Sequence, residues 1–175
     1  MPSQKFKNAL RFTLKSEGGN VDHPDDEGGR TGQGILQSEY SLWLKQQGMK
    51  DRDVFDMPEK HRDAIYEKKY WTPIGAEGMP APVGYVAFDS AVLHGVGFAQ
   101  KAIQRALNVK VDGIIGRMTL AAANAIDPIV FEQRMREQRW ARMQSKKSFP
   151  VFKAGWEKRL NDVGKNVRSM LNLKG

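Results

Sequence analysis

The sequence of 175 residues contains no cysteine, only 3 histidines and 4 tyrosines. The absence of cysteine excludes a disulfide framework and thiol catalysis. Long apolar runs are also missing. The best candidate, residues 79–99, is interrupted by Asp89 and His94 and is expected to form a buried helix rather than to cross a bilayer. The first seven residues lack the apolar segment of a secretory signal, so we expect a soluble protein made in the cytoplasm without a signal peptide.

The sequence also lacks the patterns of metal-binding and phosphate-binding sites. His23 stands among loop carboxylates, but these residues lack the ligand spacing of zinc sites and the pattern of an EF-hand. Gly28 and Gly29 lack the lysine and the preceding apolar strand of a phosphate-binding loop. We therefore predict no metal and no cofactor. His61 is expected at the surface and His94 in packing contacts.

Positive charge is concentrated near the C-terminus. The net charge is +8, and residues 127–175 hold 12 Lys and Arg against 5 Asp and Glu, whereas residues 1–126 hold 16 against 15. Two interpretations remain open. The basic region binds a polyanion, such as an anionic outer-membrane surface, or it is an ordinary solvated face of paired helices.

Apolar residues recur mostly at helical spacing, which predicts a mainly α protein. Ser3 and Asp127 are expected to cap helices, and Asp56 with Glu59 has the spacing of a capping box. The sequence shows no tandem repeat, low-complexity tract or flexible linker. The helices are expected over residues 4–17, 38–48, 57–71, 82–94, 98–107, 119–125 and 128–142 and, after a break at Phe149-Pro150, over residues 151–171.

The first of these helices carries a carboxylate at its end. Phe6, Leu10 and Leu14 mark its apolar stripe, and Glu17 continues that stripe just before two glycines that stop the helix. At the margin of the core, the ionised form of a carboxyl group is disfavoured, as a proton donor requires. The alternative interpretation is a helix-terminal glutamate that reaches water.

The segment after Glu17 is dense in acidic and turn-forming residues, and residues 30–35 have the character of a returning strand. A helix leading into a hairpin would place Glu17 opposite the hairpin carboxylates across a cleft. Glycosidic bond cleavage uses such a pair, one carboxyl protonated and one ionised. Thr31 offers a hydroxyl that can orient a water. On chemistry alone, the second carboxylate is one of four: Asp22, Asp25, Asp26 and Glu27.

The run that begins at Glu17 resembles the opening of glycoside hydrolase family 108, whose members are mostly phage and prophage muramidases. The family hallmark is Glu-Gly-Gly-Tyr, then Asp-x-Gly-Gly-x-Thr and Tyr-Gly-Ile. The resemblance implies that Glu17 is the catalytic glutamate, Asp26 the catalytic aspartate of the hairpin and Thr31 the catalytic threonine. Asn20 and Gln33 stand where the family has tyrosines, and both are assigned to substrate binding.

Three later segments extend the resemblance. Residues 66–71 are similar to the "IYxxxYW" helix end of the family, and residues 88–95 to its "FDxAVxxG" helix. Residues 104–119 are similar to the "DGxxGxxT" feature of the peptidoglycan-binding region that follows in such proteins. Tyr70 and Asp89, from the first two segments, complete the implied substrate-binding set.

The resemblance implies a mainly α, α+β lysozyme-like fold, in which a helical bundle carries one small β-hairpin as a cleft wall. Residues 1–97 would form the catalytic part and residues 98–175 a helical peptidoglycan-binding-like region, both fused into one compact body. The implied enzyme is a monomeric phage or prophage endolysin that cuts the β-1,4 bond between N-acetylmuramic acid and N-acetylglucosamine. It would act on peptidoglycan glycan strands in the periplasm or cell wall after membrane permeabilisation, and no nucleic acid partner is expected.

Three alternatives stay open at the level of the sequence. A lytic transglycosylase would use the same substrate but leave an anhydro-muramic end. A secreted antibacterial muramidase effector would share the chemistry but not the biological setting. A non-catalytic module would bind cell wall or nucleic acid through its basic end without turnover.

Overall fold

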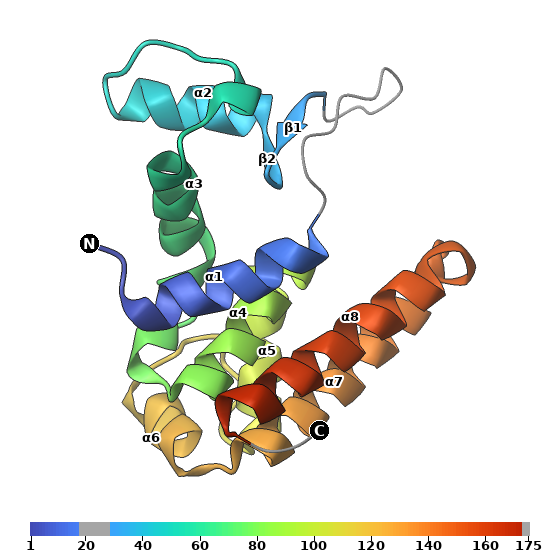
Figure 1. Cartoon of the computed structure of the whole chain (residues 1–175). Coiled ribbons are helices and arrows are strands. Elements are labelled where there is room, and N and C mark those ends of the chain that lie inside the picture. Colours follow the sequence, from blue (N-terminus) through green and yellow to red (C-terminus); the bar gives the residue numbers. More distant parts are fainter. Residues whose placement is uncertain (18–28, 173–175) are drawn as a thin grey trace.

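The computed structural model describes residues 1–17 and 29–172, and in these residues the chain is mainly helical with one two-stranded sheet (Figure 1). The central element is α4 (Ala81–His94), which is apolar on nearly all sides and buried from Pro82 to Ala91. A helix of this kind must be covered all round. It packs against α1 (Gln4–Ser16), α5 (Val96–Ala106), α7 (Pro128–Gln144) and α8 (Phe149–Met170).

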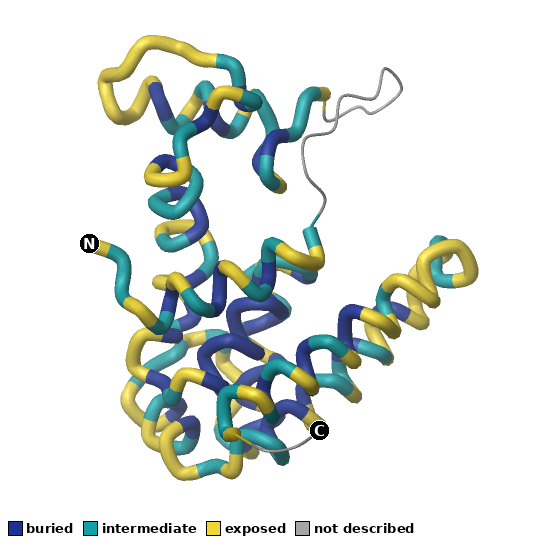
Figure 2. Tube along the Cα trace, viewed as in Figure 1, coloured by how far each residue is buried: buried dark blue, intermediate teal, exposed yellow. Residues whose placement is uncertain are grey.

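Aromatic rings fix α1 against α4. Phe6 of α1 meets Phe88 of α4 with ring centroids 5.8 Å apart, and both rings meet Trp71 at 5.6 Å in edge-on geometry. All three side chains are buried. Figure 2 shows the buried residues gathered in this helical body. The C-terminal end of α1, which carries Glu17, is therefore held on a rigid base.

A smaller lobe stands above the body. It contains β1 (Thr31–Gly32), β2 (Ile35–Leu36), α2 (Gln37–Gln46) and the 3-10 turn η1 (Val54–Asp56). The strands are antiparallel, with Thr31 opposite Leu36 and Gly32 opposite Ile35. The helix α3 (Glu59–Tyr66), continued by the π-helical turn η2 (Glu67–Trp71), connects this lobe to the body (Figure 1).

The last two long helices, α7 and α8, run side by side away from the body (Figure 1). The 3-10 turn η3 (Ala76–Gly78) and α6 (Arg117–Ala125) belong to the part of the body that lies away from the projecting ends of α7 and α8. Arg136 of α7 bonds the carbonyl of Leu160 and the amide oxygen of Asn161 on α8, each at 2.9 Å. A Cβ at Gly164 would collide with Arg136 Nη2, so the glycine permits this close approach.

The predicted fold class is confirmed, and two of the expected caps are present. The Ser3 side chain accepts from the amide of Phe6, and Asp127 accepts from the amide of Ile129. The proposed division near residue 98 falls inside α5, so the domain boundary stays a prediction. Within the described ranges, no helix combines the length and apolarity needed to traverse a bilayer.

Three local expectations were wrong. Asp56 does not cap α3, because it is committed to the 3-10 turn that Asp53 caps, and Pro58 precedes the helix instead. Phe149-Pro150 does not break the chain. Proline sits in the first turn of α8, where its missing N–H needs no partner. His61 is buried, and its Nδ1 lies 2.8 Å from the Tyr40 hydroxyl.

Candidate active site

Glu17 ends α1 with extended backbone angles, φ −83° and ψ 147°, and its amide still donates to the carbonyl of Thr13. The apolar stripe that includes the buried Phe6 and Leu10 directs the end of this helix onto the body. The Glu17 side chain is 25% exposed. It is therefore accessible to a substrate while being fixed on one side by protein.

The partner of Glu17 comes from the far end of the chain. Arg159 of α8 donates from Nη1 to Glu17 Oε1 at 2.7 Å, and its side chain is only 8% exposed. Burial would lower the pKa of Arg159, but the carboxylates of Asp89 and Glu17 outweigh burial and raise it. Arg159 is therefore a permanent cation beside Glu17.

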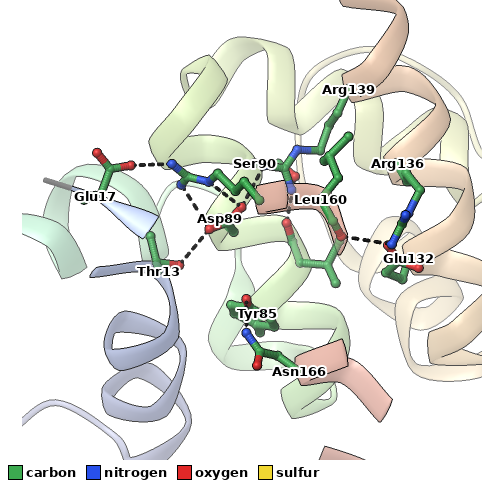
Figure 3. A network of polar contacts seen from close by, with 12 residues as sticks. Thr13, Glu17, Tyr85, Asp89, Ser90, Glu132, Arg136, Arg139, Leu160 and Asn166 are labelled. Atoms are coloured by element: carbon green, nitrogen blue, oxygen red, sulfur yellow. Dashed lines mark hydrogen bonds and ion pairs between the residues drawn. The ribbon is translucent and has the colours of Figure 1, made fainter. Parts of the chain in front are cut away.

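Asp89 accepts hydrogen bonds from Arg159, Arg139 and Thr13, and Figure 3 shows Asp89 within this network of polar contacts. Its Oδ1 accepts from Arg159 Nη2 at 3.0 Å and from the Thr13 hydroxyl at 3.1 Å. Its Oδ2 accepts from Arg139 Nη2 at 2.7 Å and from Arg159 Nε at 3.2 Å. Burial alone would raise the pKa of Asp89, but Arg159 and Arg139 outweigh it and lower the pKa to about 2.

The burial of Asp89 corrects one sequence-based assignment. We expected Asp89 to bind substrate, yet the residue is 0% exposed and both of its oxygens are occupied by guanidinium groups. A side chain without accessible surface cannot touch a sugar. Asp89 instead acts on the site through Arg159, which it orients toward Glu17.

The β-hairpin turn lies opposite Glu17. Gln33 and Gly34 form the two central positions of the turn and have φ of 51° and 82°, the pattern of a two-residue hairpin turn. A Cβ built on Gly34 would lie 4.0 Å from the Cβ of Glu17 and would collide with the Tyr66 hydroxyl. The small lobe and the body thus meet at Glu17.

Tyr66 connects these parts. Its hydroxyl donates to the carbonyl of Gln33 at 3.1 Å. Burial raises the pKa of Tyr66, and the negative charge of Glu17 raises it further, so the hydroxyl stays a proton-bearing donor beside Glu17. Tyr70 packs on Tyr66 with ring centroids 5.6 Å apart and is half-buried.

The other predicted site residues have separate positions. The Thr31 hydroxyl donates to the carbonyl of Gly29 at 3.4 Å at the start of β1. The Gln33 amide accepts from Arg62 at 2.7 Å and donates to the carbonyl of Met57 at 3.3 Å, which ties the hairpin to α3. Asn20 and Asp26 lie outside the described residues.

A hollow of about 390 Å³ adjoins the Glu17–Arg159 pair on the side of α8. Its walls include the Trp156 ring, cationic side chains and Ser16, the neighbour of Glu17. The hollow can therefore offer both ring stacking and charge to a ligand. No three potential metal-ligating side chains come together within residues 1–17 and 29–172. The hollow is lined by Lys15, Ser16, Leu93, Gly155, Trp156, Lys158, Arg159 and Asp162.

The sequence did not predict two residues of the site. Arg159 contacts Glu17 itself, and Tyr66 contacts the hairpin turn beside Glu17. Arg159 is 142 positions from Glu17 and lies in the basic C-terminal region, so no local pattern could connect them. Tyr66 is the first residue of the segment 66–71 that resembles the helix end of the family. Its four-residue spacing to Tyr70 was a usable signal, since residues so spaced share one helix face.

Comparisons with known proteins show which family and which solved structure this chain resembles. The sequence model of the family described as glycosyl hydrolase 108 matches residues 10–95. Among solved structures, that of Brucella abortus SagA is similar to this chain with a TM-score of 0.77 and 29% sequence identity, covering 94% of each chain. No curated protein matches the sequence.

The matched segment contains Glu17, the hairpin, Tyr66 and Asp89, and stops before α5. The fold and the family together define a glycoside hydrolase with a lysozyme-like, mainly helical structure. The match of residues 10–95 to the glycosyl hydrolase 108 family supports a peptidoglycan hydrolase of the muramidase type.

Proposed function

We propose that this enzyme hydrolyses the β-1,4 bond between N-acetylmuramic acid and N-acetylglucosamine in peptidoglycan, with Glu17 as the proton donor. The observation that supports the proposal is the position of Glu17, partly exposed at the end of α1, beside Arg159 and opposite the hairpin turn. Cleavage requires a proton at the glycosidic oxygen as the bond to the anomeric carbon breaks.

The charges around Glu17 are compatible with this role. Two carboxylates, Glu17 and Asp89, face two guanidinium groups, Arg139 and Arg159. Asp89 binds Arg159 through two hydrogen bonds, so Arg159 keeps a counter-ion whenever Glu17 carries a proton. The arrangement allows Glu17 to change its charge without leaving a buried cation unpaired.

Asp26 and Thr31 complete the proposed mechanism. Asp26 would stabilise the positive charge that develops on the sugar or activate the attacking water, and Thr31 would orient that water. Asn20, Gln33 and Tyr70 are proposed to contact the glycan. A carboxyl separation of about 5–5.5 Å would give retention of configuration, and one of about 6.5–9.5 Å would give inversion.

Turbidity loss of purified peptidoglycan tests the proposal. Glu17→Gln should keep the circular dichroism spectrum of the wild type and abolish clearing, while Glu137→Gln, an exposed glutamate of α7, should clear normally. Substantial clearing by Glu17→Gln would refute its role. Mass analysis of the products separates the chemistries: a hydrated reducing muramic end supports hydrolysis, and an anhydro end supports a lytic transglycosylase.

We further propose an endolysin role in host lysis, supported by the resemblance to phage and prophage muramidases. The enzyme would be made in the cytoplasm and reach the wall after membrane permeabilisation. Expression in a Gram-negative host should cause lysis only together with a membrane-permeabilising protein. Lysis without such a protein would contradict this setting, and an adjacent immunity gene would favour a secreted effector.

A further inference from the structure

The ends of α7 and α8 farthest from the body form a projecting tip, residues 140–156, which we call the α7–α8 tip (Figure 1). These 17 residues contain four cationic side chains and not one carboxylate. They also contain four aromatic rings. The cations are Arg142, Lys146, Lys147 and Lys153, and the rings are Trp140, Phe149, Phe152 and Trp156.

Apolar side chains of the tip are open to solvent. Val151 is 77% exposed and Phe152 is 53% exposed, and Lys146, Lys147 and Lys153 around them are exposed as well (Figure 2 shows the exposed residues of this tip). Exposed large apolar side chains that cluster together commonly mark an interaction surface. The tip therefore combines apolar and positive surface at one extremity of the molecule.

The aromatic rings of the tip pack against one another in the unbound protein. The centroid of Phe149 lies 5.2 Å from Trp140 and 6.3 Å from Trp156, and Phe152 lies 5.7 Å from Trp156. Lys146 Nζ stands 5.6 Å above the Trp156 ring. Ordered rings lose little conformational freedom on binding, which favours association.

The remainder of α8 does not share this character. Leu160, Val163 and Val167 are 4%, 2% and 0% exposed, and Arg159 is bound to Asp89 and Glu17. The apolar face of this half of the helix packs against the body, and its exposed side chains, such as Lys158 and Lys165, are polar. Among the described residues of the basic C-terminal helices, which the sequence suggested as a membrane contact, exposed large apolar side chains occur only at the projecting end.

We propose that the α7–α8 tip binds the surface of an anionic phospholipid bilayer. The exposed Val151 and Phe152 side chains insert at the level of the headgroups, while Lys and Arg contact lipid phosphates. The acid-free composition supplies charge complementarity to such a surface. The proposal does not depend on the chemistry of Glu17, because neither Val151 nor Phe152 belongs to the proposed catalytic residues.

Vesicle sedimentation tests this contact with the whole protein. Wild type should sediment with vesicles of phosphatidylcholine and phosphatidylglycerol, should bind pure phosphatidylcholine at least tenfold more weakly, and should be released by added salt. The double variant Val151→Asp/Phe152→Asp should lose at least tenfold in binding. The matched control Ile114→Asp/Met118→Asp changes two side chains of similar exposure on and before α6 and should bind like wild type.

Hydrolysis of purified peptidoglycan is measured in parallel and should be unchanged in the tip variant. Failure of wild type to bind anionic vesicles, or equal binding to both lipids, would overturn the proposal. Equal loss in the control variant would overturn it too. A tip variant that alters the sedimentation mass would identify a second copy of the chain as the occupant instead, and one that loses wall hydrolysis would identify the glycan.

Discussion

At the scale of single residues, Arg159 decides the electrostatics of the site. It is bound by Asp89 through two hydrogen bonds and reaches Glu17 with its remaining terminal nitrogen. Because Asp89 holds the guanidinium group in place, Arg159 should fix the position of the Glu17 side chain for proton transfer.

Arg159→Met tests this expectation. Removal of the guanidinium group takes away the hydrogen bond that holds the Glu17 carboxylate, so kcat on purified peptidoglycan should fall by about tenfold or more. Arg159→Lys keeps the charge but not the simultaneous contacts of the guanidinium group with Asp89 and Glu17, so it should recover only part of the lost kcat. A thermal melt monitors folding of both variants. An unchanged kcat in Arg159→Met would contradict the assigned role.

His94 makes stability depend on pH. Burial, with Arg139 and Arg142 nearby, lowers the pKa of His94 from 6.5 to about 3. As the pH falls below 6.5, His94 binds a proton in the unfolded chain but not yet in the folded chain. The contribution of neutral His94 to the free energy of unfolding is therefore fully present above pH 6.5 and is lost progressively as the pH falls toward 3.

His94→Leu should reduce this loss. Neither ring nitrogen of His94 has a hydrogen-bond partner among the described residues, and the ring packs on Phe98 with centroids 5.0 Å apart. An apolar side chain should gain about 1 kcal/mol at neutral pH, and more at pH 4.5. Urea denaturation at both pH values measures the difference. An equal loss of stability in variant and wild type between the two values would contradict this origin.

At the scale of elements, the β-hairpin turn is fitted to Tyr66 and Glu17. Gly34 has φ of 82°, and a side chain there would meet the Tyr66 hydroxyl. Both features require glycine, one for the backbone conformation and one for space. The conformation of the turn and the position of Glu17 are thus coupled.

Gly34→Ala should therefore cost about 1–3 kcal/mol of stability and reduce activity. Tyr66→Phe removes the hydroxyl that the new methyl group would meet, so it should restore part of the loss when combined with Gly34→Ala. Gly97→Ala is a suitable control because a Cβ at this helical position meets open space. Full additivity of the two changes in urea denaturation would contradict the collision.

The same scale shows what the sequence could predict. Local patterns were sufficient for helix existence and for the caps at Ser3 and Asp127, because such signals act within four residues. They failed at Asp56 and at Phe149-Pro150, where a proline could either end or begin a helix. The surroundings of Glu17 could be predicted only in part. The sequence indicated the apolar stripe of the helix, but the counter-ion of Glu17, Arg159, is brought there by tertiary packing.

At the scale of the whole molecule, α8 is part of the core. Val163 and Val167 belong to the same buried cluster as Phe6 and Phe88. Asn166 of α8 donates to the Tyr85 hydroxyl of α4 at 2.9 Å. The C-terminal helices therefore stabilise the segment that matches family 108 rather than being attached beside it.

Deletion of residues 150–175 should yield an insoluble or unfolded protein. It exposes the apolar surface that Leu160, Val163 and Val167 cover and leaves Asp89 paired only with Arg139 among its cations. A chain that stops after Leu171 keeps all of these groups and should melt like wild type. A soluble, active product of the longer deletion would show that α8 is dispensable for the fold.

The contact between Glu17 and Arg159 also has a consequence for the order of assembly. A nascent chain has all of residues 10–95 long before Arg159 emerges from the ribosome. During that interval the glutamate lacks its cation and α4 lacks one of its covering helices. Translation itself thus delays the pairing of Glu17 with Arg159 until α8 has been synthesised.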